Sequence, residues 1–512
     1  MKNHIPASCL LPCTILLASF ALTFPAIGTE QVFKAGNSDN GTWSEPVTWS
    51  NGTLSNGDDL VFGSGGRQTS NNDIVGLSVH NITFLGSPVM DATGNGITLT
   101  GNITRTGPSN RFALQIDVEL SSGSHVLSND SGSANLFKIG RNATASITGS
   151  GSIVKSGAGD LWIAGHDNTF TGGVTVNDGI VRAGDGNPSS AVGTVFGTGA
   201  VVVNDSGTLD INRNAQVEVR SLGGSGTITN AATTGGPSTL TVNNSSSNTF
   251  SGNITDSQIL SLQKAGSGTL TLSGALSQRG KTKVDAGTLL IDGTHVQTVA
   301  VSGNGYNKST EGNYEVGSGA TLGGTGRIAG NNSQSNSNLI LAKSGGVIAP
   351  GSGGIGNFIL DAAALTGNNA AFLRMSTGSK FSFDLSGDGS SADEIHFWSY
   401  GSGKFVLNSN EINFALTGSQ VAGNYTVTLF RFYSDGGDTA MASGISSGLT
   451  VGTLGTGINS ATIVYNTNTI DLNYGVDVIP EPGTAAFLLM VGLVAVLGIR
   501  RRNHEPPRTT IV

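Results

Sequence analysis

The chain has 512 residues, a formal net charge of −8 at pH 7, 77 glycines, 12% charged residues and 6% aromatic residues. Because 37% of the residues are hydrophobic and few are charged, the composition excludes a disordered chain and is typical of a turn-rich β protein. Lys2, Arg500, Arg501, Arg502 and Arg508 lie near the two ends, so the body between them is more acidic still. An acidic body without a basic stripe repels phosphate backbones, and nucleic acid is therefore not an expected partner.

Residues 1–28 have the three parts of a secretory signal peptide: a lysine near the start, the apolar stretch 15–22, and small residues leading to Gly28. We expect cleavage after Gly28. Both cysteines, Cys9 and Cys13, fall inside this segment. The exported chain is therefore predicted to have no disulfide, no thiolate metal site and no cysteine nucleophile.

Residues 29–100 are expected to form an N-terminal β cap. This segment contains two tryptophans, Trp43 and Trp49, followed by the short apolar run Leu60, Val61 and Phe62. The tryptophans could stack on sugars at the surface, but packing inside the cap is the favoured interpretation.

Two segments of the central region align almost position for position. One runs KSGAGDLWIAG from Lys155, the other runs KAGSGTLTLSG from Lys264, and each is followed by an alternating strand that reaches Gly179 or Gly287. Stacked repeats can bury apolar faces that a single repeat cannot, so residues 101–370 are predicted to form a β-solenoid with coils of about 20 to 30 residues. The period of two assigns seven side chains to the interior: Leu161, Ile163, Leu270, Leu272, Val284, Leu289 and Ile291.

Three short sequences match catalytic motifs. Residues 351–356 fit GxGxxG, residues 444–448 fit GxSxG, and residues 280–282 are similar to the end of a P-loop. None lies in the strand and helix context that its chemistry requires, so we interpret all three as turns of a glycine-rich chain. The sequence therefore predicts no catalytic residue and no cofactor.

Residues 371–478 contain fewer glycine corners and are predicted to form a C-terminal β region that closes the open edge of the solenoid. The best acidic cluster of the chain, Asp384, Asp388, Asp393 and Glu394, lies here in a Gly-Ser loop. We interpret these residues as solvated turn residues. A calcium site formed by Asp384, Asp388 and Asp393, or a catalytic role, remains an alternative.

Residues 483–499 form an uncharged apolar stretch followed directly by Arg500, Arg501 and Arg502. As a helix rising about 1.5 Å per residue, this stretch reaches roughly 25 Å, close to the hydrocarbon thickness of a bilayer. We predict one transmembrane helix, with the arginines as a stop on the cytoplasmic side and the preceding chain outside.

Pro480, Glu481 and Pro482 stand immediately before this stretch. The order Pro-Glu-Pro, apolar helix, arginine cluster resembles the PEP-CTERM sorting signal. This resemblance implies recognition by an exosortase-type membrane protease, cleavage near the Pro-Glu-Pro motif, and release to the cell surface or to an exopolysaccharide matrix. The chain departs from the family pattern in continuing through residues 503–512 after the arginines.

The repeat pattern KxGxGxLxLxG, followed by a turn and VxxGxL, resembles the autotransporter-associated β-strand repeat of surface-exposed parallel β-helices. Residues 41–62 look like the opening cap of such proteins, and residues 321–351 look like their closing coils. The resemblance implies an all-β fold, a parallel β-helix with β caps, to which the sequence adds one C-terminal transmembrane helix.

We therefore expect an exported, non-enzymatic structural or adhesive protein of the cell surface or matrix, with exopolysaccharide or cell-surface glycans as candidate partners. The alternative is a carbohydrate-active β-helix enzyme, a polysaccharide lyase or hydrolase, because such enzymes share the fold class. The expected segments are a signal peptide (1–28), a cap (29–100), solenoid repeats (101–370), a C-terminal β region (371–478), a sorting signal (479–502) and a cytoplasmic tail (503–512).

Overall fold

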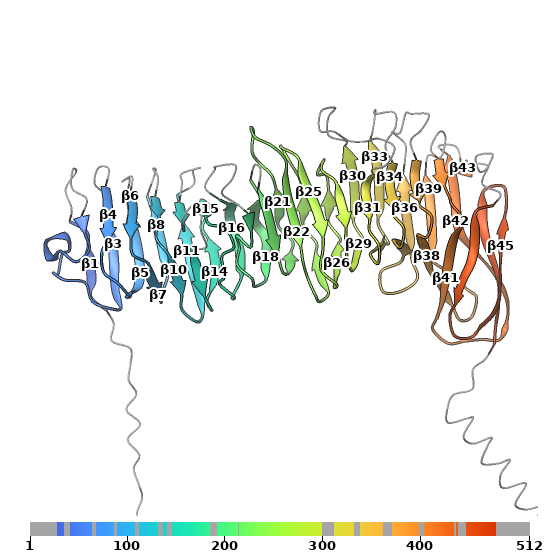
Figure 1. Ribbon diagram of the computed structural model, residues 1–512, viewed down its shortest axis with the longest axis horizontal. Coiled ribbons are helices and arrows are strands. Elements are labelled where there is room, and N and C mark those ends of the chain that lie inside the picture. The colour runs from blue at the N-terminus through green and yellow to red at the C-terminus, as the bar shows by residue number, and fades with distance from the viewer. Residues whose placement is uncertain are drawn as a thin grey trace, which may run out of the picture.

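The computed structural model describes most of the chain between residues 28 and 477. The described ranges are 28–34, 41–63, 68–86, 90–107, 112–131, 137–140, 146–184, 192–212, 215–298, 312–331, 338–361, 371–398, 404–434, 437–438 and 447–477. In these ranges the chain winds into one long β-solenoid, whose colour runs in order from the N-terminal to the C-terminal end (Figure 1).

A sheet of nine strands forms one face of the solenoid from residue 192 onward, and every pairing within it is parallel. Each strand between β17 and β40, the two ends of this sheet, pairs with the strands one coil earlier and one coil later, so no hydrogen-bonding edge is left open between these coils. Its strands are β17 (Val192–Gly193), β19 (Gln216–Val219), β22 (Ser238–Val242), β25 (Leu260–Lys264), β28 (Thr282–Val284), β31 (Gly312–Val316), β34 (Asn338–Ala342), β37 (Ala371–Met375) and β40 (Lys404–Val406).

A second row of parallel strands follows the same winding. It contains β8 (Ile103–Thr106), β11 (Ser124–Asn129), β14 (Ser152–Ser156), β16 (Val174–Ala183), β18 (Val201–Asp210), β20 (Leu222–Gly224), β23 (Asn248–Phe250), β26 (Thr269–Leu272), β29 (Thr288–Ile291), β32 (Thr321–Gly324), β35 (Val347–Pro350), β38 (Lys380–Ser386), β41 (Asn410–Thr417) and β44 (Leu449–Leu454).

A third row begins at the N-terminal end and shares the long strands β16 and β18 with the second row. It contains β2 (Gly41–Thr42), β4 (Gln68–Asn72), β6 (Met90–Gly94), β9 (Phe112–Leu114), β12 (Phe137–Ile139), β15 (Asp160–Ile163), β21 (Thr227–Thr229), β24 (Asn253–Ile254), β27 (Ala275–Leu276), β30 (Thr294–Thr298), β33 (Arg327–Asn331), β36 (Asn357–Asp361), β39 (Glu394–Trp398) and β42 (Gly423–Ser434).

The first coils are completed by β1 (Glu30–Val32), β3 (Asp58–Phe62), β5 (Leu77–Leu85), β7 (Ile97–Leu99), β10 (Val118–Leu120) and β13 (Ile147–Gly149). These strands also pair in parallel, β1 with β3, β3 with β5, and β7 with β10. Parallel pairing thus runs across residue 100, and the pairings of β37, β38 and β39 carry it across residue 370.

The core is a column of apolar side chains that point inward from successive coils. All seven side chains that the alternation assigns to the interior are 0% exposed, which confirms that prediction. Residues in register stack directly on one another, so each coil covers the apolar face of the next. One such stack passes through six coils: Leu270, Leu289, Leu322, Ile348, Phe381 and Ile412.

Aromatic side chains close the N-terminal end of this core. Trp43 and Trp49 are both 0% exposed and meet edge to face, with 5.8 Å between ring centroids. The indole N–H of Trp49 donates to the carbonyl of Trp43 at 3.0 Å, and the ring of Phe62 packs against both. The two tryptophans therefore pack inside the end of the solenoid and offer no surface to a sugar.

The C-terminal end changes to antiparallel pairing. Strand β46 (Thr469–Val476) pairs antiparallel with β42 on one side and with β45 (Ile458–Tyr465) on the other, and β43 (Gly437–Asp438) pairs antiparallel with β42. This change ends the stacking of parallel coils, because an antiparallel strand cannot continue the winding.

Helix is almost absent from the described residues, which contain one short 3₁₀ turn, Pro46–Thr48. Within the same ranges no helix has the length and apolar character needed to cross a bilayer. The predicted transmembrane segment at 483–499 lies outside the described residues.

Candidate functional site

The predicted sorting residues cannot be placed in the fold. Pro480, Glu481 and Pro482, with Arg500, Arg501 and Arg502, lie outside the described residues, whose last member is Asp477. Of the three motif-like sequences, residues 351–356 lie in the turn between β35 and β36, residues 280–282 lead into β28, and residues 444–446 are outside the described ranges. The first two are therefore turns of the solenoid, as interpreted from the sequence.

Two of the candidate metal ligands, Asp388 and Asp393, accept hydrogen bonds from nearby groups, and the interpretation of the cluster as solvated turn residues is wrong for Asp393, which is buried. The Asp393 carboxylate is 1% exposed and accepts the backbone N–H groups of Gly356 at 2.8 Å and Asp384 at 2.7 Å. Asp388 lies in the turn that follows β38, where its carboxylate accepts a hydrogen bond from the hydroxyl of Ser390 at 2.7 Å. Within the described ranges, no group of three His, Cys, Asp or Glu side chains is arranged to hold a metal ion.

The ionisation of these carboxyl groups differs with their surroundings. Burial raises the pKa of Asp393 to about 7, aided by the negative charge of Asp384 and opposed by the two N–H donors. Burial also raises the pKa of Asp384. Asp388 is exposed, and its hydrogen bonds with the Ser390 side chain and backbone lower its pKa to about 2. With a pKa of about 7, Asp393 is therefore partly protonated at neutral pH, whereas Asp388 is ionised.

The repeats contain a feature that the sequence reasoning missed: their first lysine is buried. Lys155 is the penultimate residue of β14 and is 0% exposed. Its ammonium donates to the carbonyls of Ser156 at 2.7 Å, Gly157 at 2.5 Å and Asp178 at 3.0 Å. An ammonium has three donors, and all three are used. Burial lowers the pKa of Lys155 to about 8, with the nearby carboxylates opposing the shift.

Lys264 repeats this arrangement at the end of β25. Its side chain is also 0% exposed and donates to the carbonyls of Gly266 and Ala286, the latter at 3.2 Å. These acceptors occupy the repeat positions that Gly157 and Asp178 occupy around Lys155. Burial lowers the pKa of Lys264 as well. We call this arrangement the lysine clamp: a buried ammonium that joins the corner of its own coil to the corner of the next.

A glycine at the second corner makes room for the lysine clamp. Gly179 and Gly287 have φ of 67° and 64°, in the left-handed region that glycine adopts without strain. A Cβ atom at Gly179 would lie 2.5 Å from the carbonyl oxygen of Gly157 and 2.8 Å from the ammonium of Lys155. The lysine and the glycines of the repeat are thus parts of one packed corner. The sequence signal for the burial of Lys155 was the period-two alternation of β14, which points Lys155 to the same side as the buried Ile153.

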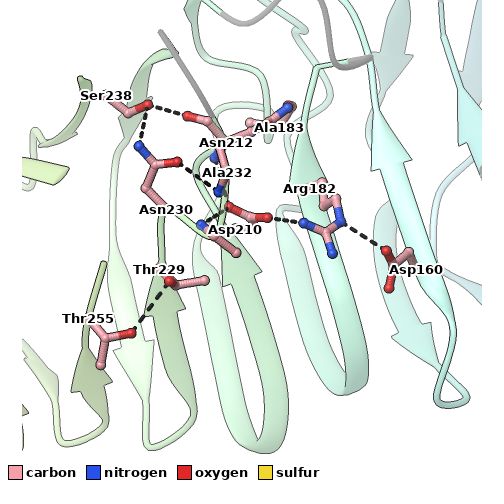
Figure 2. A network of polar contacts seen from close by, with 11 residues as sticks. Asp160, Arg182, Ala183, Asp210, Asn212, Thr229, Asn230, Ala232, Ser238 and Thr255 are labelled. Carbon is pink, nitrogen blue, oxygen red and sulfur yellow. Dashed lines mark hydrogen bonds and ion pairs between the residues drawn. The ribbon is translucent and has the colours of Figure 1, made fainter. Parts of the chain in front are cut away.

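On the outer side of the first repeat, a charged ladder joins three successive coils (Figure 2). The guanidinium of Arg182 donates to Asp160 at 2.9 Å and also to Asp210, and it lies over the indole ring of Trp162 at 5.5 Å. Asp210 is 0% exposed. Its second oxygen accepts the backbone N–H of Asn212 at 2.9 Å.

The ladder continues as neutral hydrogen bonds toward the next coil (Figure 2). The side-chain amide of Asn212 donates to the backbone carbonyl of Ala183 at 3.1 Å. The backbone carbonyl of Asn212 accepts a hydrogen bond from the hydroxyl of Ser238. The Asn230 amide donates to the same hydroxyl at 3.1 Å. In this arrangement one arginine bridges the two carboxylates, a geometry suited to holding coils together rather than to proton transfer.

Further ion pairs also join side chains of neighbouring coils. The carboxylate of Glu315 forms ion pairs with the ammonium of Lys281 at 3.1 Å and with that of Lys343 at 2.7 Å. Burial alone would raise the pKa of Glu315, but the hydrogen bonds and charges of the two lysines lower it. Pairs of the same kind are Arg279 with Asp256, Arg327 with Asp361, and Lys380 with Glu411. The charged side chains of the outer faces thus reinforce the stacking of the coils.

Comparison with known proteins locates two kinds of family feature. A family model described as passenger-associated-transport-repeat matches residues 153–183 and 262–291, the two segments with the lysine clamps. A model described as PEP-CTERM protein-sorting motif matches residues 478–502. No curated protein matches the chain.

A PEP-CTERM motif implies export, membrane anchoring through the C-terminal region, and processing by an exosortase, a membrane protease. The matched repeats account for parts of a solenoid whose remaining coils follow the same parallel winding. The chain is an exported β-repeat protein that carries passenger-associated-transport repeats and a PEP-CTERM sorting motif.

Proposed function

We propose that the protein is a non-catalytic structural or adhesive component of the cell surface or extracellular matrix. The observation that carries this proposal is the joint presence of one continuous parallel solenoid and a sorting motif at its C-terminal end. A solenoid whose coils are locked by core stacks, lysine clamps and cross-coil ion pairs is a stiff rod, and a rod suits a spacer or scaffold outside the cell.

A carbohydrate-active enzyme is the alternative, and the arrangement of the carboxylates favours the structural proposal. An acid-base mechanism needs a carboxylate that can exchange a proton with substrate. Asp160 and Asp210 are bridged by Arg182, and Asp361 is paired with Arg327. Incubation of the purified protein with soluble polysaccharides tests the proposal, because any release of new reducing or unsaturated ends would contradict it.

The sorting part of the proposal assigns Pro480, Glu481 and Pro482 to recognition by the exosortase, residues 483–499 to the anchor, and Arg500, Arg501 and Arg502 to the stop. In the Glu481→Ala variant the apolar stretch and the arginines are unchanged. A permanent anchor would tolerate the change, whereas a processed chain should accumulate uncleaved in the inner membrane.

The measurement is the mature size and the cellular fraction of tagged protein. Glu505→Ala is the matched control, because it makes the same substitution beyond the arginines. We expect the control to match the original chain and the Glu481 variant to be retained. If all three proteins have the same size and the same surface release, the processing role is wrong and only the anchor remains.

A further inference from the structure

The outer face of the last coils carries an aromatic pair at the surface. Trp398 ends β39 and is 41% exposed, and its indole ring meets the ring of Tyr433 on β42 edge to face, with 6.2 Å between ring centroids. The two strands lie side by side (Figure 1) and pair in parallel with Phe397 opposite Phe432. This register sets Trp398 and Tyr433 next to each other on the outer side of the sheet.

Polar side chains border the aromatic pair on the same two strands. Glu394 accepts a hydrogen bond from His396 at 2.7 Å and one from Arg431 at 3.4 Å. Burial raises the pKa of Glu394, but the hydrogen bond and charge of His396 and the charge of Arg431 outweigh it, so the net pKa is lowered. The ring of His396 also meets Tyr433, at 5.5 Å between centroids. A carboxylate, an imidazole and a guanidinium therefore lie beside the two aromatic rings.

The support beneath this surface is rigid. Phe397 and Phe432 are both 0% exposed and stack with their centroids 5.0 Å apart and an interplanar angle of 5°. Phe405 packs against Phe397 at 5.0 Å. Because the neighbours of Trp398 and Tyr433 in each strand are anchored in this cluster, the two outer rings are held in place before any ligand arrives, which reduces the entropy lost on binding.

We propose that Trp398, Tyr433, Glu394, His396 and Arg431 form a binding site for a neutral polysaccharide, a proposal that rests on the extracellular role above. A sugar ring has an apolar C–H face, which an indole can cover, and a rim of hydroxyl groups, which a carboxylate and a guanidinium can bind. Because the charge of one carboxylate is offset by that of one guanidinium, the site favours an uncharged polysaccharide. Among the described residues, Val47 and Val75 are exposed on distant coils, Val421 precedes the start of β42 while Tyr433 lies near its end, and Val451 lies on β44 in the second row of strands. These side chains are therefore separate from the aromatic pair, and the site does not extend into an apolar patch that would suit a lipid surface.

Affinity electrophoresis of the full-length protein tests this proposal in gels that contain hydroxyethylcellulose or dextran as neutral probes and alginate as an acidic probe. We expect retardation by at least one neutral probe and at least a tenfold weaker apparent affinity in Trp398→Ala. Trp162→Ala is the matched control, because Trp162 is also partly exposed but lies many coils away under Arg182. Tyr433→Ala should weaken binding as well, and unchanged thermal unfolding shows that each variant is folded.

A second readout is the quenching of tryptophan fluorescence by acrylamide. Trp43 and Trp49 are buried, so quenching reports mainly Trp398 and Trp162. A bound probe should protect the original chain and the Trp162 variant but not the Trp398 variant. Absence of retardation by both neutral probes, retardation by alginate alone, or equal loss in both tryptophan variants would overturn the site. Each of these results leaves the localisation experiment on Glu481 unaffected, so the site and the proposed function can fail separately.

Discussion

The repeat coils and the C-terminal coils share one winding but differ in the charge of the side chain that fills an interior corner. In the first repeat, the interior corner holds the ammonium of Lys155, which donates to three backbone carbonyls. In the C-terminal coils, the corner between β38 and β39 holds the carboxylate of Asp393, which accepts two backbone N–H groups. In both regions a tight corner leaves backbone polar groups inside the fold, and a side chain of complementary charge satisfies them.

The apolar parts of the two regions differ as well. The interior of the repeats is mainly aliphatic, with Leu270, Leu272 and Leu289 in stacks. The interior of the C-terminal coils is packed with phenylalanines, of which Phe381, Phe430 and Phe405 contact one another. Phe430 lies on β42, the strand with which β46 pairs antiparallel, so this aromatic cluster packs where the parallel winding ends.

The largest effect is expected where the repeat core itself is broken. Leu270→Asp places a carboxylate at a position that is 0% exposed and has no complementary donor in the stack, which costs several kcal/mol. We expect loss of cooperative unfolding of the repeat coils, measured by circular dichroism during heating. Thr271→Asp is the control, because Thr271 is the next residue of the same strand and points outward. Similar unfolding of the two variants would contradict the inward assignment.

A smaller loss is expected when the lysine clamp is removed. Lys155→Met keeps most of the side-chain volume but leaves three partly buried carbonyls without this donor, which costs about 2–3 kcal/mol. Lys380→Met removes a lysine whose ion pair with Glu411 is largely exposed, and such pairs contribute about 0–1 kcal/mol. Thermal unfolding midpoints and limited proteolysis compare the two variants. Equal unfolding midpoints would mean that the buried lysine contributes no more to the stability of the fold than a surface ion pair does.

Two pH dependences of opposite sign are also expected, and over any single pH unit they are smaller than the effects of these substitutions. Asp393 has a raised pKa of about 7, so between about pH 4 and 7 the unfolded chain releases a proton that the folded chain keeps, and stability falls as pH rises. Lys155 has a lowered pKa of about 8, so above pH 8 the folded chain releases a proton that the unfolded chain keeps, and stability rises. Each slope is at most about 1.4 kcal/mol per pH unit.

Unfolding midpoints measured from pH 4 to 9.5 check both slopes. Asp393→Asn should remove the fall below pH 7 and keep the rise above pH 8, and Lys155→Met should do the reverse. A profile that neither substitution changes would show that other groups control the response to pH.

Local sequence pattern determined which side chains point inward and where the chain repeats. Strict alternation is a property of the strand itself, so Leu161, Leu270 and Val284 could be assigned to the core without knowing which strands pair. The sorting motif at Pro480 to Pro482 was equally local, and the family match at residues 478–502 confirms it. The buried Lys155 carried the same alternation signal, but lysine is so seldom buried that the signal was not followed.

Contacts between coils were decided by the tertiary structure alone. Loops of unequal length separate the strands, so spacing along the chain does not reveal that Arg182 stands between Asp160 and Asp210, or that Trp398 stands beside Tyr433. The parallel winding also continues through β37 to β42, where the repeat pattern has faded. The inward direction of a side chain depends on its position in the alternation of its own strand. Contact between coils depends on the register of strands that are separated by a whole turn of the solenoid, and only the folded chain sets that register.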